Sequence, residues 1–304
     1  MSGNPQTPAE TFAKSAPLRS ATRWFFRKSP FASGYGAVAC SRVAKVLCPP
    51  SADLVWADIR GIRCPVPLND LVGRSMYLMG DLDPKLTWVI DRVLSPGDTA
   101  LDAGANLGLM TALIASRVGE HGRVLAFEPS PLMQERLRRM KAANPGIPVE
   151  LFPVALGRAQ GESELRVPPG NAGQASLLDH PDRPVEHVFK VRVEPLSAIL
   201  EQCGITEVRL LKIDVEGFES EVLTGLFTGP SPVMPQVILF EENRPRTATT
   251  FSILKAKGYD LFALPRRLIR VALIGQGDPG FVRAHDFVAI HHQAPADIRA
   301  RLGV

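Results

Sequence analysis

One stretch, residues 98–129, constrains the fold of this chain more than any other. A short apolar segment leads into the pattern D-x-G-x-N-x-G, which begins at Asp102, and an apolar helical run follows. A second apolar segment then ends in Glu128. Strand, glycine turn, helix, strand and acidic residue in that order predict a nucleotide-binding βαβ unit. The residues between Gly108 and Gly122 suffice for the one helix that a parallel strand pair needs.

The residue types in this turn indicate which nucleotide would bind. Dinucleotide sites favour G-x-G-x-x-G, but counting from Gly104 places Asn106 and Leu109 where the second and third glycines belong. Asp102 would repel a pyrophosphate, whereas it suits the positive amine and sulfonium of S-adenosylmethionine. Glu128 can accept hydrogen bonds from both ribose hydroxyls. A nicotinamide oxidoreductase is therefore disfavoured, and a plain α/β turn with incidental acids is the remaining alternative.

The charge of the chain is unevenly spread. Residues 1–50 contain seven Lys or Arg and one Glu, a balance of +6, so the rest sums to −2 out of a net +4. A body of this charge is not suited to neutralising phosphates, and we expect no nucleic-acid partner. The four cysteines form no C-x-x-C pair, so no zinc site is expected and a reducing, cytoplasmic location fits. No apolar run reaches the roughly 18 residues of a membrane span.

The N-terminal 50 residues differ in character from the rest. Residues 1–22 are rich in Ser, Thr, Ala and Pro, and are expected to be disordered. Residues 23–28 mix aromatic and basic side chains, which indicates either a peripheral contact with a membrane or partner, or a helix that packs its aromatics on the body. The run is short and Pro30 ends it, so the packing interpretation is favoured.

Acidic residues follow the other predicted strands as well. They are Asp102, Glu128, Asp214 with Glu216, and Glu241 with Glu242 and Asn243. Ligands of open α/β sheets bind beyond the carboxyl ends of the strands, and isolated buried carboxylates are costly, so this set predicts a site. Glu219 and Glu221, further along the next helix, are expected to be exposed. Segment 168–184, rich in Pro and Gly, is either a loop over the site or a variable insertion.

Three segments carry a resemblance to a known family. Residues 101–108 (L-D-A-G-A-N-L-G), 124–129 (V-L-A-F-E-P) and 211–219 (L-K-I-D-V-E-G-F-E) together resemble the FkbM family of S-adenosylmethionine-dependent methyltransferases, the third segment most specifically. The resemblance covers roughly residues 70–292. It implies an α/β, Rossmann-like class I methyltransferase fold with a mostly parallel seven-stranded sheet, helices on both faces and its last two strands antiparallel at one edge.

The expected organisation places a small extension before this fold. It comprises a basic, partly disordered arm at 1–50, a β-hairpin region at 51–80, the methyltransferase domain at 81–292, and a C-terminal tail at 293–304. Within the last domain, Asp83 and Pro84 are expected to cap and begin a helix. The oligomeric state is not indicated.

The resemblance also implies roles for individual residues. Cofactor binding is carried over to the matching motif positions Asp102, Gly104, Asn106, Gly108 and Glu128. The implied reaction is O-methylation of a hydroxyl on a sugar, glycan or secondary metabolite, with the acceptor itself not fixed. Enzymes that methylate base nitrogens carry an Asn- or Asp-Pro-Pro-aromatic run at the fourth strand, and D-V-E-G stands there instead, which argues against base methylation.

A hydroxyl must lose its proton during methylation, so a carboxylate base is expected. Asp214 and Glu216 are the first candidates, with Glu241 and Glu242 behind them, and we assign Asp214, Glu216 and Glu242 as catalytic. Asp214 has an alternative role as a structural carboxylate that caps the next helix. Two alternatives to this function are a non-catalytic scaffold that retains the fold and a catechol-type enzyme with Mg²⁺ between the fourth and fifth strand ends. No metal ligand is assigned.

Overall fold

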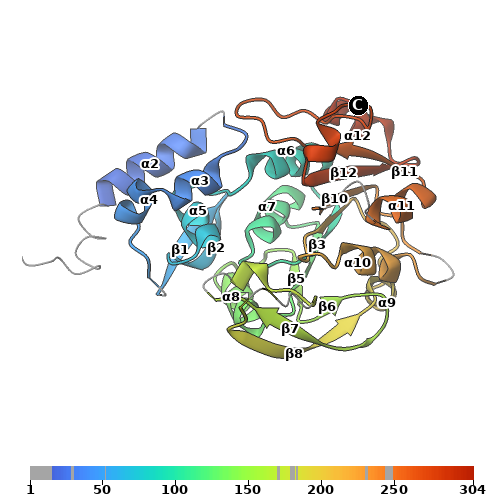
Figure 1. The fold of residues 1–304 in the computed structure, drawn as a ribbon, viewed down its shortest axis with the longest axis horizontal. Coiled ribbons are helices and arrows are strands. Elements are labelled where there is room, and N and C mark those ends of the chain that lie inside the picture. The colour runs from blue at the N-terminus through green and yellow to red at the C-terminus, as the bar shows by residue number, and fades with distance from the viewer. Residues whose placement is uncertain are drawn as a thin grey trace, which may run out of the picture.

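A seven-stranded sheet forms the centre of this computed structural model, which describes residues 16–28, 31–51, 53–169, 172–178, 182, 184–229, 232–243 and 249–304 (Figure 1). Its order is β11-β12-β10-β9-β3-β4-β5. The strands are β3 (Thr99–Ala103), β4 (Arg123–Phe127), β5 (Val149–Phe152), β9 (Leu210–Ile213), β10 (Val237–Glu241), β11 (Tyr259–Ala263) and β12 (Asp286–His291). The mostly parallel seven-stranded sheet expected from the resemblance is confirmed.

One detail of the sheet differs from expectation. The strand β12 lies between β10 and β11 and is antiparallel to both, so β11 runs in the same direction as the other five. The expectation that both last strands are antiparallel is therefore wrong for β11. The end of β11 at Ala263 pairs with Phe287 at the start of β12, so the chain leaves and re-enters the sheet at the same end, which reverses β12 alone.

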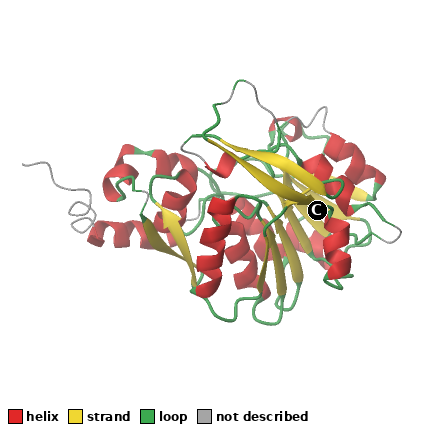
Figure 2. Cartoon of the chain, turned by 90° about the horizontal axis from the view of Figure 1, so that it is seen from below, coloured by secondary structure: helices red, strands yellow, loops and turns green. Residues whose placement is uncertain are grey.

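Helices cover both faces of the sheet, as Figure 2 shows for the yellow strands between red helices. One face carries α6 (Pro84–Val93), α7 (Leu109–Val118), α8 (Pro131–Ala142) and α12 (Ala296–Leu302). The other carries α9 (Leu196–Gln202), α10 (Glu219–Leu226) and α11 (Thr249–Ala256). The strands are mostly apolar, and all four residues of β9 are buried, because a strand in a sheet covered on both faces has little access to solvent.

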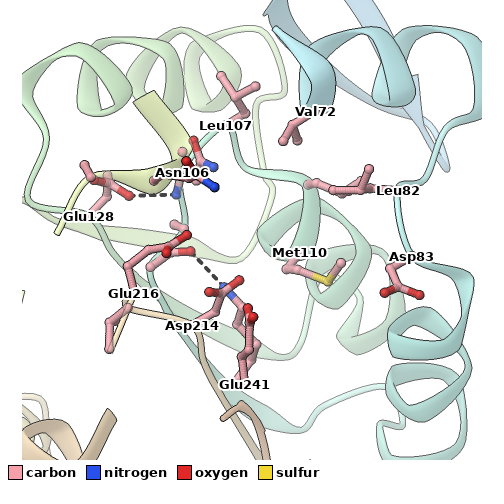
Figure 3. A pocket seen from close by; sticks show the side chains of 18 of the residues that line it. Val72, Leu82, Asp83, Asn106, Leu107, Met110, Glu128, Asp214, Glu216 and Glu241 are labelled. Atoms are coloured by element: carbon pink, nitrogen blue, oxygen red, sulfur yellow. Dashed lines mark hydrogen bonds and ion pairs between the residues drawn. The ribbon is translucent and has the colours of Figure 1, made fainter. Parts of the chain in front are cut away.

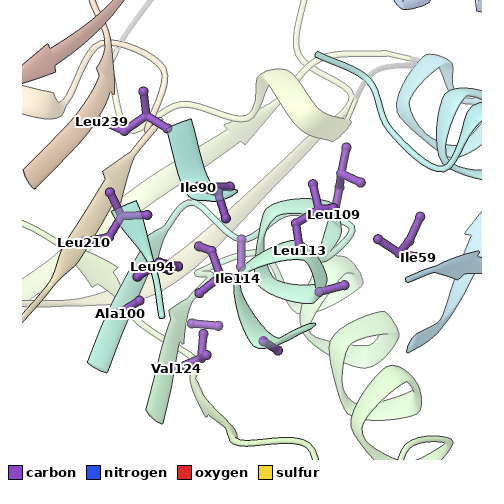
Figure 4. Packing of buried hydrophobic residues seen from close by; sticks show 14 of the residues in the cluster. Ile59, Ile90, Leu94, Ala100, Leu109, Leu113, Ile114, Val124, Leu210 and Leu239 are labelled. Carbon is purple, nitrogen blue, oxygen red and sulfur yellow. The ribbon is translucent and has the colours of Figure 1, made fainter. Parts of the chain in front are cut away.

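Alternate residues of each strand serve the two faces. Ile90 of α6 and Leu113 and Ile114 of α7 belong to one core cluster with Ala100 of β3 (Figure 4), and all four are 0–1% exposed. The next residue of the strand, Leu101, belongs to the core of the opposite face. This period of two is the geometry of a pleated strand, and it explains how one short apolar run supplies two cores.

The N-terminal region forms a separate cap of helices around a hairpin. It contains α2 (Ala16–Lys28), α3 (Tyr35–Cys40), α4 (Arg42–Leu47) and α5 (Leu71–Met79), with the antiparallel strands β1 (Leu54–Ile59) and β2 (Ile62–Pro67). Its small core includes Tyr35, Leu47 and Leu78. Disorder was expected for residues 1–22, but residues 16–22 lie in α2. Residues 1–15 lie outside the described part of the chain.

Two further segments complete the fold. A three-stranded sheet in the order β6-β8-β7 joins β6 (Ala155–Leu156), β8 (His187–Glu194) and β7 (Gly161–Val167), and the 3₁₀ turns are η1 (Ala172–Gln174) and η2 (Phe281–Arg283). The segment 293–304, expected as a tail, contains α12, whose Ile298 and Leu302 are buried against the main core. None of the helices in the described part of the chain has the length and apolar content needed to cross a bilayer.

Candidate active site

The turn after β3 has three residues with positive φ at a spacing of two. These are Gly104 (φ 81°), Asn106 (φ 49°) and Gly108 (φ 84°), and glycine and asparagine are the residues that adopt such angles most readily. A Cβ on Gly104 would lie 1.9 Å from the carbonyl oxygen of Asp214, so this turn packs directly against the end of β9. The G-x-N-x-G spacing is thus explained by backbone geometry.

Glu128 and Asn106 are held together by the backbone. The amide of Asn106 donates to Glu128 Oε2 at 2.7 Å, and the amide of Ser130 donates to Glu128 Oε1 at 2.8 Å (Figure 3). Glu128 is 7% exposed, and this burial raises the pKa of its carboxyl to about 7 against the opposing effect of the two hydrogen bonds. Both residues line a cavity, as does Gly104, whereas Gly108 lies behind the wall at the start of α7.

Asp102 lies deeper than the sequence indicates. It is 0% exposed, it does not line the cavity, and its Oδ2 accepts a hydrogen bond of 2.6 Å from Thr111 Oγ1. Its Oδ1 forms an ion pair of 3.2 Å with Lys212 Nζ. The structure therefore places Asp102 behind the site, where it acts on the cavity through Lys212.

Lys212 is the residue of this site that sequence reasoning missed. Its Nζ donates to the carbonyl oxygen of Gly104 at 2.8 Å and lies 3.7 Å from Asp214 Oδ2. Burial lowers the pKa of the Lys212 ammonium, but Asp102 and Asp214 outweigh that effect, so the pKa lies above its usual value and the group stays charged. The available signal was a lysine within an otherwise apolar strand, since lysine is almost never buried without a partner.

The turn after β9 is held in an unusual conformation. Glu216 has φ 52°, which is uncommon for a residue other than glycine, and it is followed by Gly217 with φ 97°. Glu219 Oε1 accepts hydrogen bonds from the amides of Val215 and Gly217, each at 3.2 Å, and Ser176 Oγ donates to the Glu216 carbonyl at 2.9 Å. Glu219 is 6% exposed, so the expectation that it faces solvent is wrong, and burial raises the pKa of its carboxyl.

The end of β10 contributes Glu241 and not Glu242. Glu241 lines the cavity, and burial, followed by the nearby carboxylates of Asp214 and Asp286, raises the pKa of its carboxyl to about 7. Glu242 does not line the cavity, and its Oε2 accepts a hydrogen bond of 3.0 Å from Thr250 Oγ1. Of the three residues assigned as catalytic, the structure thus brings Asp214 and Glu216 to the cavity and leaves Glu242 outside it.

A second cluster of charged side chains, at the start of α6 and of β12, consists of Asp83, Lys85 and Asp286. Asp83 occupies the N-cap position of α6, but its side chain makes no capping hydrogen bond, contrary to expectation, and forms an ion pair with Lys85. Lys85, which is 1% exposed, also pairs with Asp286 at 2.9 Å. Burial raises the pKa of the Asp83 carboxyl while Lys85 opposes the rise. The sequence indicated only a local capping role for Asp83, so the contact that Lys85 makes between Asp83 and the distant Asp286 was not predicted.

One cavity of about 660 Å³ connects these groups (Figure 3). Asn106 and Glu128 lie at one end, and Val72, Leu82 and Met110 form an apolar wall at the other. Six carboxylates and two cations line it, namely Asp83, Glu128, Asp214, Glu216, Glu241 and Asp286 with Lys212 and Arg266. Four residues of the described segment 172–178 also line it, so this part of the 168–184 loop lies at the site. Among described residues, no group of three His, Cys, Asp or Glu side chains is arranged to hold a metal ion.

Comparison with models of known protein families identifies the family of this chain. The model of the methyltransferase FkbM domain matches residues 102–261, which are 160 of the 304 residues. The chain belongs to the FkbM methyltransferase family. The matched segment begins at Asp102 and includes both strand ends that carry Asp214 and Glu241, whereas Asp83, Arg266 and Asp286 of the cavity lie outside it.

Curated relatives include two fungal methyltransferases and a segment of a larger bacterial enzyme. Methyltransferase 1 of Beauveria bassiana is 29% identical over 183 residues, and methyltransferase sdnD of Sordaria araneosa is 28% identical over 191 residues. These alignments cover 54% and 53% of this chain and 73% of each relative. The AMB antimetabolite synthetase AmbE of Pseudomonas aeruginosa is 29% identical over 194 aligned positions, in an alignment that covers 52% of this chain but only 9% of that protein.

Solved structures with a similar fold are more distant. The methyltransferase FkbM of Methylobacillus flagellatus is 14% identical, with a TM-score of 0.38 over 93% of this chain and 60% of that one. An S-adenosylmethionine-dependent O-methyltransferase of Thermotoga maritima is 12% identical, with a TM-score of 0.39 over 69% of this chain and 66% of that one.

Proposed function

We propose that this methyltransferase uses S-adenosylmethionine to methylate a hydroxyl oxygen on a small-molecule or glycan acceptor. The observation that carries the proposal is a single cavity with two differently built ends. One end has the glycine turn and Glu128, and the other has an apolar wall beside carboxylates whose pKa is raised. A donor site and an acceptor site with a base are the two parts that methyl transfer requires.

The residues at the first end fit the donor. Each carboxylate oxygen of Glu128 accepts one amide hydrogen bond and retains a lone pair for a ribose hydroxyl. The excess of carboxylates over cations around the cavity suits a ligand with a positively charged amine and sulfonium. Glu128 and Asn106 would hold the nucleoside part, and Lys212, through its bond to the Gly104 carbonyl, fixes the turn next to it. S-adenosylmethionine supplies a methyl group that the positive sulfur activates for displacement.

Glu241 is the base in this proposal, in place of Glu242. A general base works best when its pKa is near the operating pH, and the Glu241 carboxyl meets this condition. Glu241 takes the hydroxyl proton as the oxygen–carbon bond forms. The carbon–sulfur bond breaks, and its electron pair remains on sulfur. Asp214 and Glu216 line the same cavity, where they would orient the acceptor, and alignment of the reacting atoms supplies much of the rate.

Calorimetric titration with S-adenosylmethionine tests the donor site. Glu128→Gln keeps the size of the side chain but replaces one acceptor oxygen, and we expect binding at least about tenfold weaker. The matched control is Glu135→Gln, an exposed glutamate on α8. Absence of binding to the folded wild-type protein, or equal binding by Glu128→Gln, contradicts the proposal.

The acceptor chemistry is tested with a labelled methyl group. Metabolite extracts incubated with the protein and the labelled donor should yield labelled products that survive mild alkali, because methyl ethers resist it and methyl esters do not. Binding without any turnover would favour the scaffold alternative. Loss of turnover on exhaustive chelation would favour the Mg²⁺-dependent alternative.

A further inference from the structure

The loop between β11 and β12 exposes an apolar pair flanked by arginines. Leu268 and Ile269 are 61% and 63% exposed, and Arg266, Arg267 and Arg270 beside them are exposed as well. Single exposed apolar residues are ordinary, but two at the tip of a loop between cations need a reason. Apolar side chains among Lys and Arg are the composition of segments that rest in the interface of an anionic membrane.

This loop is bonded to the N-terminal cap. The amide of Ala32 donates to the Leu268 carbonyl at 2.7 Å, and Ser33 Oγ donates to the Arg267 carbonyl at 3.0 Å. Figure 1 shows the loop reaching from the sheet across to the N-terminal helices at the top of the molecule. The loop and the chain that follows α2 are therefore neighbours, although they are more than 230 residues apart in sequence.

The helix α2 has an outer face of the same composition. Leu18, Trp24 and Phe25 are 58%, 63% and 51% exposed, while Arg19 and Phe26 turn inward to the cap. In a helix Leu18 and Phe25 are seven residues apart and lie on one side. The short helix α4 repeats the pattern, because Val43 and Val46 are 67% and 64% exposed between the exposed Arg42 and Lys45.

The charge of this region selects among possible partners. Residues 1–50 carry +6 and the loop adds three arginines, whereas the rest of the protein is acidic overall. Arg267, Arg270, Arg42 and Lys45 form no ion pair within the described ranges of the chain. Such cations can pair with the anionic headgroups of a lipid bilayer, while the exposed apolar side chains beside them enter its apolar interior. Tryptophan is enriched at this membrane–water boundary.

We propose that the basic apolar surface, formed by residues 265–270 with the exposed side chains of α2 and α4, docks on an anionic lipid bilayer. Arg266 and Ser33, which lie in or next to this surface, also line the active-site cavity. Docking therefore holds the acceptor end of the cavity close to the membrane. This inference goes beyond methyl transfer, because binding to lipid requires no methyl donor.

Cosedimentation with lipid vesicles tests the docking. The full chain is mixed, without donor, with vesicles of phosphatidylcholine containing about 30% phosphatidylserine, or with phosphatidylcholine alone. We expect binding to the anionic vesicles that weakens with salt. The pairs Leu268→Ser/Ile269→Ser and Trp24→Ser/Phe25→Ser should each weaken it at least about tenfold. Arg267→Glu/Arg270→Glu should weaken it by about fivefold or more per residue.

The control places the same change on another surface. Val185 and Val188 are 45% and 53% exposed near the start of β8, which Figure 1 shows at the bottom of the molecule, so Val185→Ser/Val188→Ser should bind vesicles as the wild type does. Circular dichroism of each variant confirms that it is folded.

Several outcomes overturn the docking proposal. These are no binding to anionic vesicles, equal binding to neutral vesicles, or loop and α2 variants that bind as the control does. If the wild type does not bind vesicles but forms a dimer, and Leu268→Ser/Ile269→Ser is a monomer, the surface is instead an interface with a second copy of the chain. Titration of the same preparation with S-adenosylmethionine reports on the donor site separately, so failure of one proposal is distinguishable from failure of the other.

Discussion

At the scale of single residues, the site combines ionisable groups in two states. Lys212 and Asp102 form a buried ion pair in which the pKa of the Lys212 ammonium lies above its usual value, whereas burial raises the carboxyl pKa of Glu128 and Glu241 to about 7. The ion pair between Lys212 and Asp102 therefore links the carboxyl ends of β9 and β3. Glu128 and Glu241 can change protonation near neutral pH, and of these two only Glu241 belongs to the proposed acceptor site.

Replacement of Glu241 should reduce turnover with little effect on donor binding. Glu241→Gln removes the base, and we expect kcat to fall about 10²- to 10⁴-fold. In the wild type, kcat/KM should rise with pH through about 7, because the base acts only when deprotonated. Glu242→Gln, whose side chain bonds Thr250 outside the cavity, should retain most activity. A larger loss of kcat in Glu242→Gln than in Glu241→Gln would show that Glu242, and not Glu241, is the general base.

The buried pair gives a stability test. Asp102→Asn leaves the Lys212 ammonium without its closest carboxylate, and loss of one partner of a buried pair costs about 3–5 kcal/mol of unfolding free energy. The double variant Asp102→Asn/Lys212→Met removes the charge as well and should recover part of that loss. Urea denaturation of the two variants measures the difference. A double variant no more stable than the single one would show that the ion pair is not the cause.

Sequence patterns located these residues better than they assigned their roles. All five acidic residues lie at the carboxyl ends of strands as expected, because the carboxyl ends of parallel strands meet at one edge: Asp102 and Glu241 within the strands, and Glu128, Asp214 and Glu216 after them. Which of them reaches the cavity depends on side-chain direction, and this depends on neighbours distant in sequence. The contact between Asp102 and Lys212, 110 positions apart, has no local signature.

At the scale of elements, the turn after β3 and the turn after β9 form one unit. Gly104 of the first turn approaches the Asp214 carbonyl of the second, and Lys212 donates to the Gly104 carbonyl from below. Each turn is thus shaped by the other. The glycine pattern was predicted from its local form, but the reason for Gly104 lies in this contact between strands.

Substitution of two glycines separates close packing from backbone strain. Gly104→Ala meets both a positive φ of 81° and a clash with the Asp214 carbonyl, which is backbone and cannot move aside cheaply. Gly97→Ala meets a positive φ of 91° with nothing within 4 Å. We expect about 1–2 kcal/mol of destabilisation for Gly97→Ala and at least about 2 kcal/mol more for Gly104→Ala. Thermal or urea unfolding measures both, and equal losses would mean that the close approach is unimportant.

At the scale of the whole molecule, the residue pattern predicted the βαβ unit and the family resemblance implied the seven-stranded sheet, while neither predicted α12 or the first half of α2. The segment 293–304 is short and half polar, so it was expected as a tail, yet Ile298 and Leu302 complete the core beside α6. The first half of α2, residues 16–22, was likewise hidden by its Ser- and Ala-rich composition, because α2 is stabilised by packing against α5, where Phe26 joins the small core.

Burial of carboxyls across the protein predicts how its stability depends on pH. Burial raises the carboxyl pKa of Asp81 to about 6, and those of Glu128 and Glu241 to about 7. Each of these groups binds its proton more tightly in the folded state than in the unfolded chain, where carboxyls have a pKa near 4. Below about pH 4 these carboxyls are protonated in both the folded and the unfolded state. As pH rises above 4, the unfolded chain releases these protons first, and the folded protein releases them only near pH 6–7.

The stability that these three carboxyls contribute should therefore be greatest below about pH 4 and should decline as pH rises from about 4 to about 7. For the wholly buried Glu128, a shift from 4.5 to about 7 corresponds to at most about 3 kcal/mol. Urea denaturation at intervals of pH measures the decline. Glu128→Gln cannot ionise and should lose part of the slope, whereas the exposed Glu135→Gln should keep all of it. A slope that Glu128→Gln leaves unchanged would mean that Glu128 is already ionised in the folded protein, with its two amide hydrogen bonds outweighing burial.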